Sequence, residues 1–419
     1  MSQNVQERNT ALTKKRWLVL AASCLINLCI GAMYAWSVFA APMAEELSQL
    51  NGVTLTAASL SIVFSIGNGD GFITMIAGGF ITEKLGPKWV IFAGGVLFGL
   101  GFIVCGLAQN TGMLIVGFGL LCGLAMGLAY GQTISNSVKF FPDKAGLVGG
   151  IATASYGISS VIVPPVGNML ISQFGVRKAF IFIGIFIVIV VGICSQFIVK
   201  CPADFVPDGW NPPAAKSGAT GAADKNWKEM LATPIFYVMI VMLFLGAVFG
   251  MMAISQASNI AQSMVGMTPA AAAIVVSVLA LFNTFGRILC GYISDRIGRI
   301  NTLTGVLCLA IAALGMLYFS EGSVVLFYIG ICMIGVCFGA FMGVYPGFTA
   351  GQFGSRNSSI NYAIMFIGFS AAGIAGPMIV SKMLAATGSY RPAFLLAMVM
   401  AVCGLVLSFV YRAMAKKNA

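Results

Sequence analysis

Long apolar stretches alternate with short polar connections along the whole chain. A bilayer core of about 30 Å takes roughly 20 helical residues, and each stretch is about that long or somewhat longer. Twelve of them lie near residues 17–41, 54–81, 89–108, 112–138, 145–173, 178–199, 233–262, 268–294, 302–319, 324–352, 358–386 and 391–412. The pattern predicts an all-α membrane protein with twelve transmembrane helices.

The longest polar connection divides these spans six and six. It covers residues 200–229 and is rich in proline and lysine, a composition typical of a surface linker. We therefore expect an N-terminal six-helix bundle at 1–199, a linker at 200–229 and a C-terminal six-helix bundle at 230–419.

Composition and charge narrow the class of protein. Of all residues, 59% are hydrophobic and only 8% are charged, which excludes an ordinary soluble protein. Most of the 23 Lys and Arg residues lie in the termini, the linker and the even-numbered connections. In a membrane protein this excess marks the cytoplasmic side rather than a nucleic-acid surface. We expect a multi-pass protein of the inner (plasma) membrane with both termini in the cytoplasm, acting as a monomer.

The chemistry-bearing residues argue against an enzyme. The chain has no histidine, and its eleven cysteines form no C-x-x-C pair. We expect no metal, no cofactor and no catalytic site, so any proton handling has to use carboxylates.

Two short motifs occur once in each half. Residues 79–88 read GFITEKLGPK and residues 291–300 read GYISDRIGRI, both with the pattern G-x-x-x-acid-base-x-G. Residues 175–180 (GVRKAF) precede the sixth span, and residues 388–394 (GSYRPAF) precede the twelfth. Two matches at nearly one offset indicate duplication of a six-helix unit.

The glycine, acid, base, glycine run after spans two and eight resembles the signature of the major facilitator superfamily. The resemblance covers the whole chain and implies two six-helix bundles that rock around a central site lined by spans 1, 4, 7 and 10. It also implies a gating role for Glu83, Asp295 and Arg296, in which the carboxylates close the cytoplasmic side by pairing with cations and a helix N-terminus.

Further motifs resemble the oxalate/formate antiporter family, which is related to the monocarboxylate transporters. They are residues 281–287 (LFNTFGR) leading into 291–299, Gly131 with the FPDKAG run at 141–146, and residues 31–42 with their tyrosine, tryptophan and proline. The resemblance implies a carboxylate substrate. It also implies that Tyr34 and Tyr130 enclose this substrate.

Arg287 is the strongest candidate for binding an anion. A guanidinium keeps its proton, and a charge in mid-membrane costs at least about 2.5–3.5 kcal/mol, so it normally faces a wet cavity or a partner. Two N–H groups on one edge of the guanidinium can donate parallel hydrogen bonds to the two oxygens of a carboxylate. Asn283, four residues earlier on the same helix face, either donates a further hydrogen bond or orients the arginine. The alternative is that Arg287 extends along the helix toward Asp295 and the cytoplasm.

Asp70 is an acidic residue in the middle of the second span. A carboxylate there is protonated, paired or wet. It is a candidate for carrying the coupled proton or for pairing with Arg287. The alternative is a neutral acid that hydrogen-bonds to a neighbouring helix, which the glycines around it allow to approach closely.

The remaining candidates for substrate binding are apolar. Phe338 and Met342 lie on span ten, where the oxalate exchanger is more aromatic and polar, and either residue can equally be helix packing. On span eleven the exchanger carries a lysine eight residues after the Asn of an Asn-Tyr pair, whereas here the Asn361-Tyr362 pair leads to Phe369.

With one cation left in the cavity, a dianion would keep about one uncompensated negative charge, worth several kcal/mol. We therefore expect a small monocarboxylate such as lactate, pyruvate or formate. The alternative is exchange of oxalate or another dicarboxylate, for which Lys382 is the nearest second cation.

Coupling follows from the charge of the substrate. An anion entering an inside-negative cell works against about 2.3 kcal/mol per 100 mV, so uptake needs a proton or an exchange partner. We expect proton symport by alternating access first and monocarboxylate exchange second. A membrane sensor that uses the same fold without transport is the alternative from another class.

Overall fold

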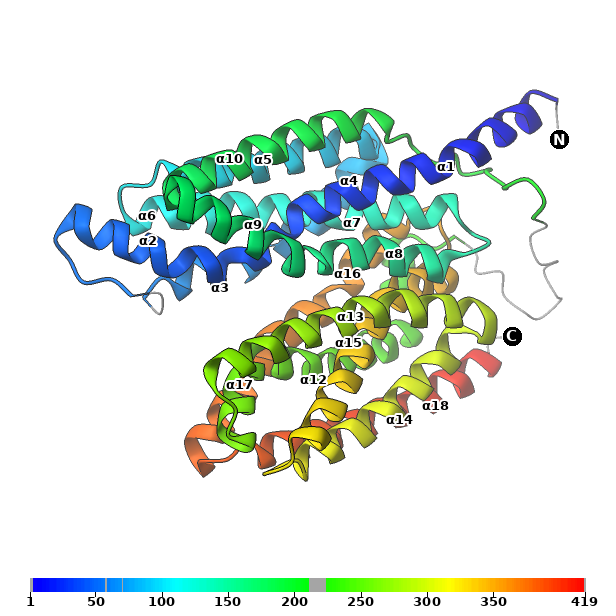
Figure 1. Ribbon diagram of the computed structural model, residues 1–419. Helices are drawn as coiled ribbons and strands as arrows, with labels where there is room; N and C mark the ends of the chain where they lie inside the picture. Colours follow the sequence, from blue (N-terminus) through cyan, green and yellow to red (C-terminus); the bar gives the residue numbers. More distant parts are fainter. Residues whose placement is uncertain (1–2, 57–58, 70, 211–223, 418–419) are drawn as a thin grey trace. The chain divides into compact units, whose positions relative to one another are not determined.

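The computed structural model describes residues 3–56, 59–69, 71–210 and 224–417, and over these residues the chain forms helices and no strand (Figure 1). The helices separate into two compact units. The first unit contains Met1–Phe140 and Ser155–Asp208, and the second contains Phe141–Ala154 and Gly209–Ala419. Each unit has its own buried core.

In the first unit, a 3-10 helix interrupts the α-helix of span one, and a π-helix interrupts that of span four. The elements are α1 (Gln3–Ile30), the 3-10 helix η1 (Gly31–Ala35), α2 (Trp36–Asn51), α3 (Ser61–Gly69), α4 (Gly71–Leu85), α5 (Pro87–Gly106), α6 (Thr111–Leu114), the π-helix η2 (Ile115–Cys122), α7 (Gly123–Phe140), α9 (Ser159–Phe174), α10 (Val176–Cys194) and the 3-10 helix η3 (Ser195–Phe197).

The second unit has long helices and one divided element. Its elements are α8 (Ala145–Gly157), α11 (Trp227–Leu231), α12 (Pro234–Val265), α13 (Pro269–Ile297), α14 (Arg299–Tyr318), α15 (Val324–Phe353), α16 (Ser358–Met365), α17 (Ile367–Thr387) and α18 (Arg391–Lys417). Helix α8 belongs to this unit only up to Ala154, and its last three residues belong to the first unit.

The apolar stretches of the sequence correspond to these helices. Eleven helical segments in the described residues are long and apolar enough to cross a membrane. The expected second span is represented by α3 and α4, which flank Asp70, a residue outside the described ranges. The first span is longer than expected, because α1, η1 and α2 follow one another from Gln3 to Asn51 and carry the helix beyond the apolar stretch on both sides.

The described ends of the linker attach to different units. In the first unit, Arg8 donates a hydrogen bond to Asp204 over 2.6 Å, and this bond holds the pKa of the Asp204 carboxyl below its ordinary value. In the second unit, the backbone N–H of Lys225 donates to the carbonyl of Phe353, and the amide of Asn361 donates to the carbonyl of Lys225.

The repeated motifs keep the same local structure in both halves. Gly86 and Gly298 both have positive φ, at 83° and 90°, and each precedes the first residue of a helix. A side chain is strained in that conformation, which explains the second glycine of the G-x-x-x-acid-base-x-G pattern.

The second repeated motif also keeps its contact. Arg177 donates to the carbonyl of Ala108 between spans three and four, and Arg391 pairs with Glu321 between spans nine and ten at 2.7 Å. In each unit the arginine thus ties the start of the last span to the equivalent connection, which supports the duplication.

Glycines allow the main helices of the second unit to touch along their backbones. A Cβ atom at Gly339 would overlap the carbonyl oxygen of Asn283, and one at Gly343 would overlap that of Arg287. On the other helix, a Cβ atom at Gly286 would overlap the carbonyl oxygen of Val336. Small residues in these positions are typical of membrane helix contacts, where close packing replaces the hydrophobic effect.

We expect Gly343→Ala to lower the free energy of unfolding by about 1–3 kcal/mol, because the new methyl group would separate α13 from α15. Thermal unfolding of the purified protein measures the loss. Gly305→Ala is the matched control, since no atom of a neighbouring helix lies within 4 Å of its Cβ position and alanine favours a helix. Equal unfolding midpoints for the two variants would contradict the packing argument.

Candidate functional site

Arg287 lies on α13 with only 2% of its surface exposed. Its Nε donates to Oδ1 of Asn283 over 3.1 Å, and its Nη1 donates to the carbonyl oxygen of Thr153 over 2.6 Å. Asn283 therefore accepts from the arginine and orients it, because a separation of four residues places the two side chains on one helix face. The guanidinium is held toward the N-terminal end of α13, away from Asp295.

The positive charge of Arg287 has no anionic partner in the described part of the chain. No carboxylate there lies within ion-pair distance of its guanidinium. A guanidinium has five N–H donors, and the two hydrogen bonds use only two of them. Three donors and the full positive charge remain for a ligand. Because the side chain is buried, leaving this charge uncompensated is costly.

The backbone around Arg287 is packed on two sides by glycines. A Cβ atom at Gly343 of α15, or at Gly150 of α8, would overlap the carbonyl oxygen of Arg287. The arginine therefore stands where α8, α13 and α15 meet, and its backbone has little room to shift.

Phe338 and Phe369 form an aromatic contact next to this position. Their ring centroids are 6.2 Å apart, and the ring of Phe338 covers Gly250 of α12. Met342, four residues after Phe338 on α15, is buried. The phenylalanines thus connect α15 to α12 and α17, whereas the glycines of α15 contact Arg287.

The two expected tyrosines lie in the first unit and are joined by a third. Tyr34 in η1 and Tyr130 in α7 both contact the ring of Tyr156, with centroids 5.2 Å and 4.8 Å away. Next to them, the buried Thr133 donates to Oδ1 of the buried Asn27 over 2.6 Å. Tyr156, Thr133 and Asn27 are absent from the sequence-based site, since no motif or unusual residue type marks them.

Asp295 lies in the last turn of α13, and both of its carboxylate oxygens accept hydrogen bonds. They accept hydrogen bonds from the backbone N–H groups of Gly146 and Leu147, each over 2.8 Å, and Oδ1 lies 3.7 Å from Nη2 of Arg299. Gly146 and Leu147 are in the first turn of α8, where N–H groups have no partner inside the helix and the helix dipole favours an anion. The helix N-terminus expected for Asp295 is that of α8.

The other candidates have separate surroundings. Glu83 is exposed on α4, and the Nζ of Lys200 donates to its carbonyl. The guanidinium of Arg296 lies 4.5 Å from the ring centre of Tyr292. Lys382 is exposed on α17. Asp70 lies outside the described residues, and within those residues no group of three His, Cys, Asp or Glu side chains is suited to hold a metal.

Comparison with known proteins shows to which family such a chain is similar. The family model of the Major Facilitator Superfamily matches residues 21–377. The chain is 28% identical to the uncharacterized MFS-type transporter YhjX of Escherichia coli K12 over 86% of each chain. It is 27% identical to the oxalate:formate antiporter of Oxalobacter formigenes, over 88% of this chain and 85% of that protein.

A solved structure shows the fold. The major facilitator superfamily transporter FucP, crystallised in an outward conformation, matches with a TM-score of 0.71 and 17% identity, over 95% of this chain and 99% of the other. The twelve-helix fold expected from the sequence is therefore confirmed, and so is the resemblance to the oxalate/formate antiporter family.

We expect Asp295→Asn to loosen the start of α8, because an amide has one accepting oxygen where the carboxylate has two. The N–H group that loses its partner should exchange its hydrogen at least about tenfold faster, which corresponds to about 1.4 kcal/mol. Hydrogen exchange of the peptide containing Gly146 and Leu147 measures this. Glu321→Gln, which breaks an exposed ion pair instead, is the control and should leave that peptide unchanged. Identical exchange in the two variants would contradict the role of Asp295.

Proposed function

Because this chain belongs to the major facilitator superfamily and is a transporter of that family, we propose that it carries a small monocarboxylate anion, such as lactate, pyruvate or formate, together with a proton. The observation that carries the proposal is the buried guanidinium of Arg287. Its hydrogen bonds go to neutral oxygens, and it keeps three donors and its charge for a ligand.

A carboxylate is the ligand that suits this group. Its two oxygens can accept two parallel N–H bonds from one guanidinium, and its negative charge offsets the cost of holding the cation in the membrane. Asn283 supports this geometry, because its bond to Nε fixes the plane of the guanidinium before the anion arrives.

The number of cations favours a monoanion. Phe369 takes the place of the second cation that the resemblance to the oxalate exchanger would require, and it packs against Phe338. Lys382, the nearest alternative, is exposed. One guanidinium balances one carboxylate, and the apolar rings of Phe338 and Phe369 suit the short carbon chain of a monocarboxylate.

A link between binding and gating follows from the contacts of α8 with α13. Two polar contacts join these helices, one from Asp295 to the start of α8 and one from Arg287 to the carbonyl of Thr153. An anion on Arg287 binds the same guanidinium that donates to that carbonyl, so its arrival bears on the second contact and not on the first. In this scheme Asp295, with Arg296 beside it and Glu83 in the other repeat, forms the gate on the side that the cation distribution marks as cytoplasmic.

A proton is needed because the substrate carries a negative charge into an inside-negative cell. Asp70 is the carboxylate that we assign to this role, since it lies within an apolar stretch of the sequence, where an acidic residue is rare and commonly functional. We further propose that the protein works as a monomer in the inner membrane with both termini in the cytoplasm. The second candidate function is exchange of dicarboxylates, favoured by the 27% identity to the oxalate:formate antiporter.

Uptake of radiolabelled lactate, pyruvate, formate and oxalate into proteoliposomes, with and without an inward proton gradient, tests the substrate. We expect saturable monocarboxylate uptake that the gradient increases. Arg287→Lys should lower uptake by about tenfold or more, because lysine cannot offer the planar fork. Lys382→Gln is the matched control and should transport normally. Saturable oxalate uptake without monocarboxylate uptake, or loss of transport in Lys382→Gln, would favour the dicarboxylate exchanger instead.

The role of Asp70 is tested separately from binding. We expect Asp70→Asn, which keeps the size of the side chain but cannot release a proton, to retain exchange of labelled for unlabelled monocarboxylate. Accumulation driven by the proton gradient should be lost. Accumulation at the wild-type level would remove Asp70 from the coupling scheme.

A further inference from the structure

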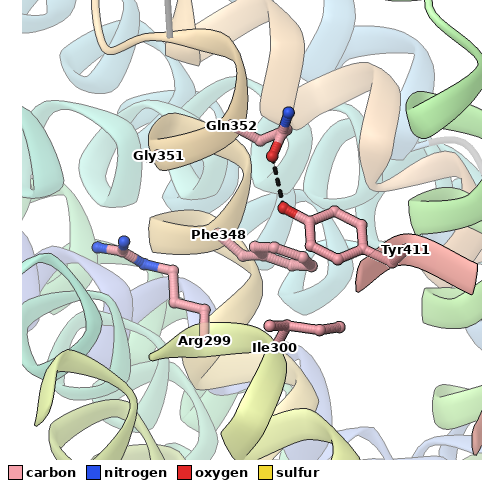
Figure 2. A pocket seen from close by; sticks show the side chains of 6 residues that line it. All are labelled: Arg299, Ile300, Phe348, Gly351, Gln352 and Tyr411. Atoms are coloured by element: carbon pink, nitrogen blue, oxygen red, sulfur yellow. Dashed lines mark hydrogen bonds between the residues drawn. The ribbon is translucent and has the colours of Figure 1, made fainter. Parts of the chain in front are cut away.

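A cavity of about 180 Å³ opens in the second unit, where α14 begins and where α15 and α18 end. Figure 2 shows its lining, with the side chains of Arg299 and Ile300 from α14, Phe348 and Gln352 from α15, and Tyr411 from α18. The volume is enough for several water molecules or one small oxyanion. No carboxylate is among the residues that line it.

Arg299 supplies a positive charge that its surroundings satisfy only in part. Its Nε is buried and has no hydrogen-bond partner among the described residues. Its nearest carboxylate, Asp295, is 3.7 Å from Nη2, beyond hydrogen-bond distance, and already accepts two backbone N–H bonds. Because Nε is buried, the part of this side chain that a ligand in the cavity can reach is its Nη groups, and the side chain as a whole is 28% exposed.

The backbone beside Arg299 adds to the positive electrostatic potential in the cavity. Arg299 is the first residue of α14, and no side chain caps the start of that helix. The first backbone hydrogen bond of α14 runs from the N–H of Thr302 to the carbonyl of Gly298. The N–H of Ile300 lies before this bond and so has no partner within the helix. An unpaired helix N-terminus beside a guanidinium attracts an anion. In the other repeat, the position equivalent to Arg299 is Pro87, which carries no charge and no N–H group.

The place of the cavity along the spans suits a phosphate group. Arg299 and Tyr411 stand near the ends of the spans formed by α14 and α18. The ends of spans lie at the level of the lipid headgroups, where arginine and tyrosine commonly contact phosphate. The hydroxyl of Tyr411 already donates to Oε1 of Gln352 over 2.5 Å, so the donors for a ligand are Arg299, the N–H of Ile300 and the Nε2 amide of Gln352 (Figure 2).

We propose that this cavity binds a phosphate group, held by the guanidinium of Arg299 and the start of α14. Free inorganic phosphate and the headgroup of a phospholipid offer the same chemistry. The site is separate from Arg287 and does not depend on the proposed transport function.

The test is thermal unfolding of delipidated protein in detergent. One arm compares sodium phosphate with sodium chloride at equal ionic strength, and the other compares added dioleoyl phosphatidylglycerol with dioleoylglycerol, which lacks the phosphate. We expect at least one phosphate probe to raise the unfolding midpoint by about 2 °C or more in the wild type. The shift should disappear in Arg299→Gln and persist in Arg356→Gln, an exposed cation of the same unit that does not line the cavity.

Gly351→Ala is a second variant that keeps the charge. Its Cβ atom would lie 3.0 Å from Nη1 of Arg299, so it should displace the guanidinium and reduce the shift. A shift with inorganic phosphate shows that the free anion is sufficient, whereas a shift with the phospholipid alone assigns the site to lipid. The same shift in Arg287→Lys separates this site from the proposed transport site. No shift with either probe, or an undiminished shift in Arg299→Gln, would overturn the proposal.

Discussion

The second unit is organised around one buried guanidinium that no carboxylate in the described residues neutralises. A charge within a membrane span is tolerated only if its hydrogen bonds are satisfied or a cavity admits a ligand. Arg287 meets this requirement in part, through an amide on its own helix and a backbone carbonyl of α8. Arg287 can reach the carbonyl of Thr153 because glycines of α8 and α15 lie against the backbone of α13 and let the helices approach closely. The close packing of three helices and the position of the charge therefore depend on each other.

The same helix pair is held at a second point by opposite chemistry. At its far end α13 presents a carboxylate, and the start of α8 presents the N–H groups that favour a negative charge. About two turns earlier along α13 the helix presents a cation, and α8 presents the backbone carbonyl of Thr153. Helix α8 is thus bound to α13 at its N-terminus by an anion and farther along by a cation. An anion that enters at Arg287 changes only one of these contacts, which gives the proposed link between binding and gating a physical basis.

The two halves share the residues that shape the backbone, as a duplication predicts, but their charged residues differ. The glycines before α5 and α14 share their positive φ, and the arginines at the start of α10 and α18 both contact the equivalent connection. These positions serve the backbone and the connections, so both halves need them. The charged positions differ, since Arg299 in the second half corresponds to Pro87 in the first. The phosphate site proposed at Arg299 therefore belongs to one half only.

The amino-acid sequence by itself determined the spans, the duplicated unit, the family and the importance of Arg287. These features depend on hydrophobic length, on repeated motifs and on the cost of a charge in an apolar span, all of which can be recognised from residue types. Tertiary structure alone decided that Thr153 binds Arg287 through its carbonyl, that Tyr156 joins Tyr34 to Tyr130, and that the helix start paired with Asp295 is that of α8. A backbone carbonyl is the same in every residue type and so carries no signal in the sequence. Its partner here is remote along the chain and is chosen only when the helices pack.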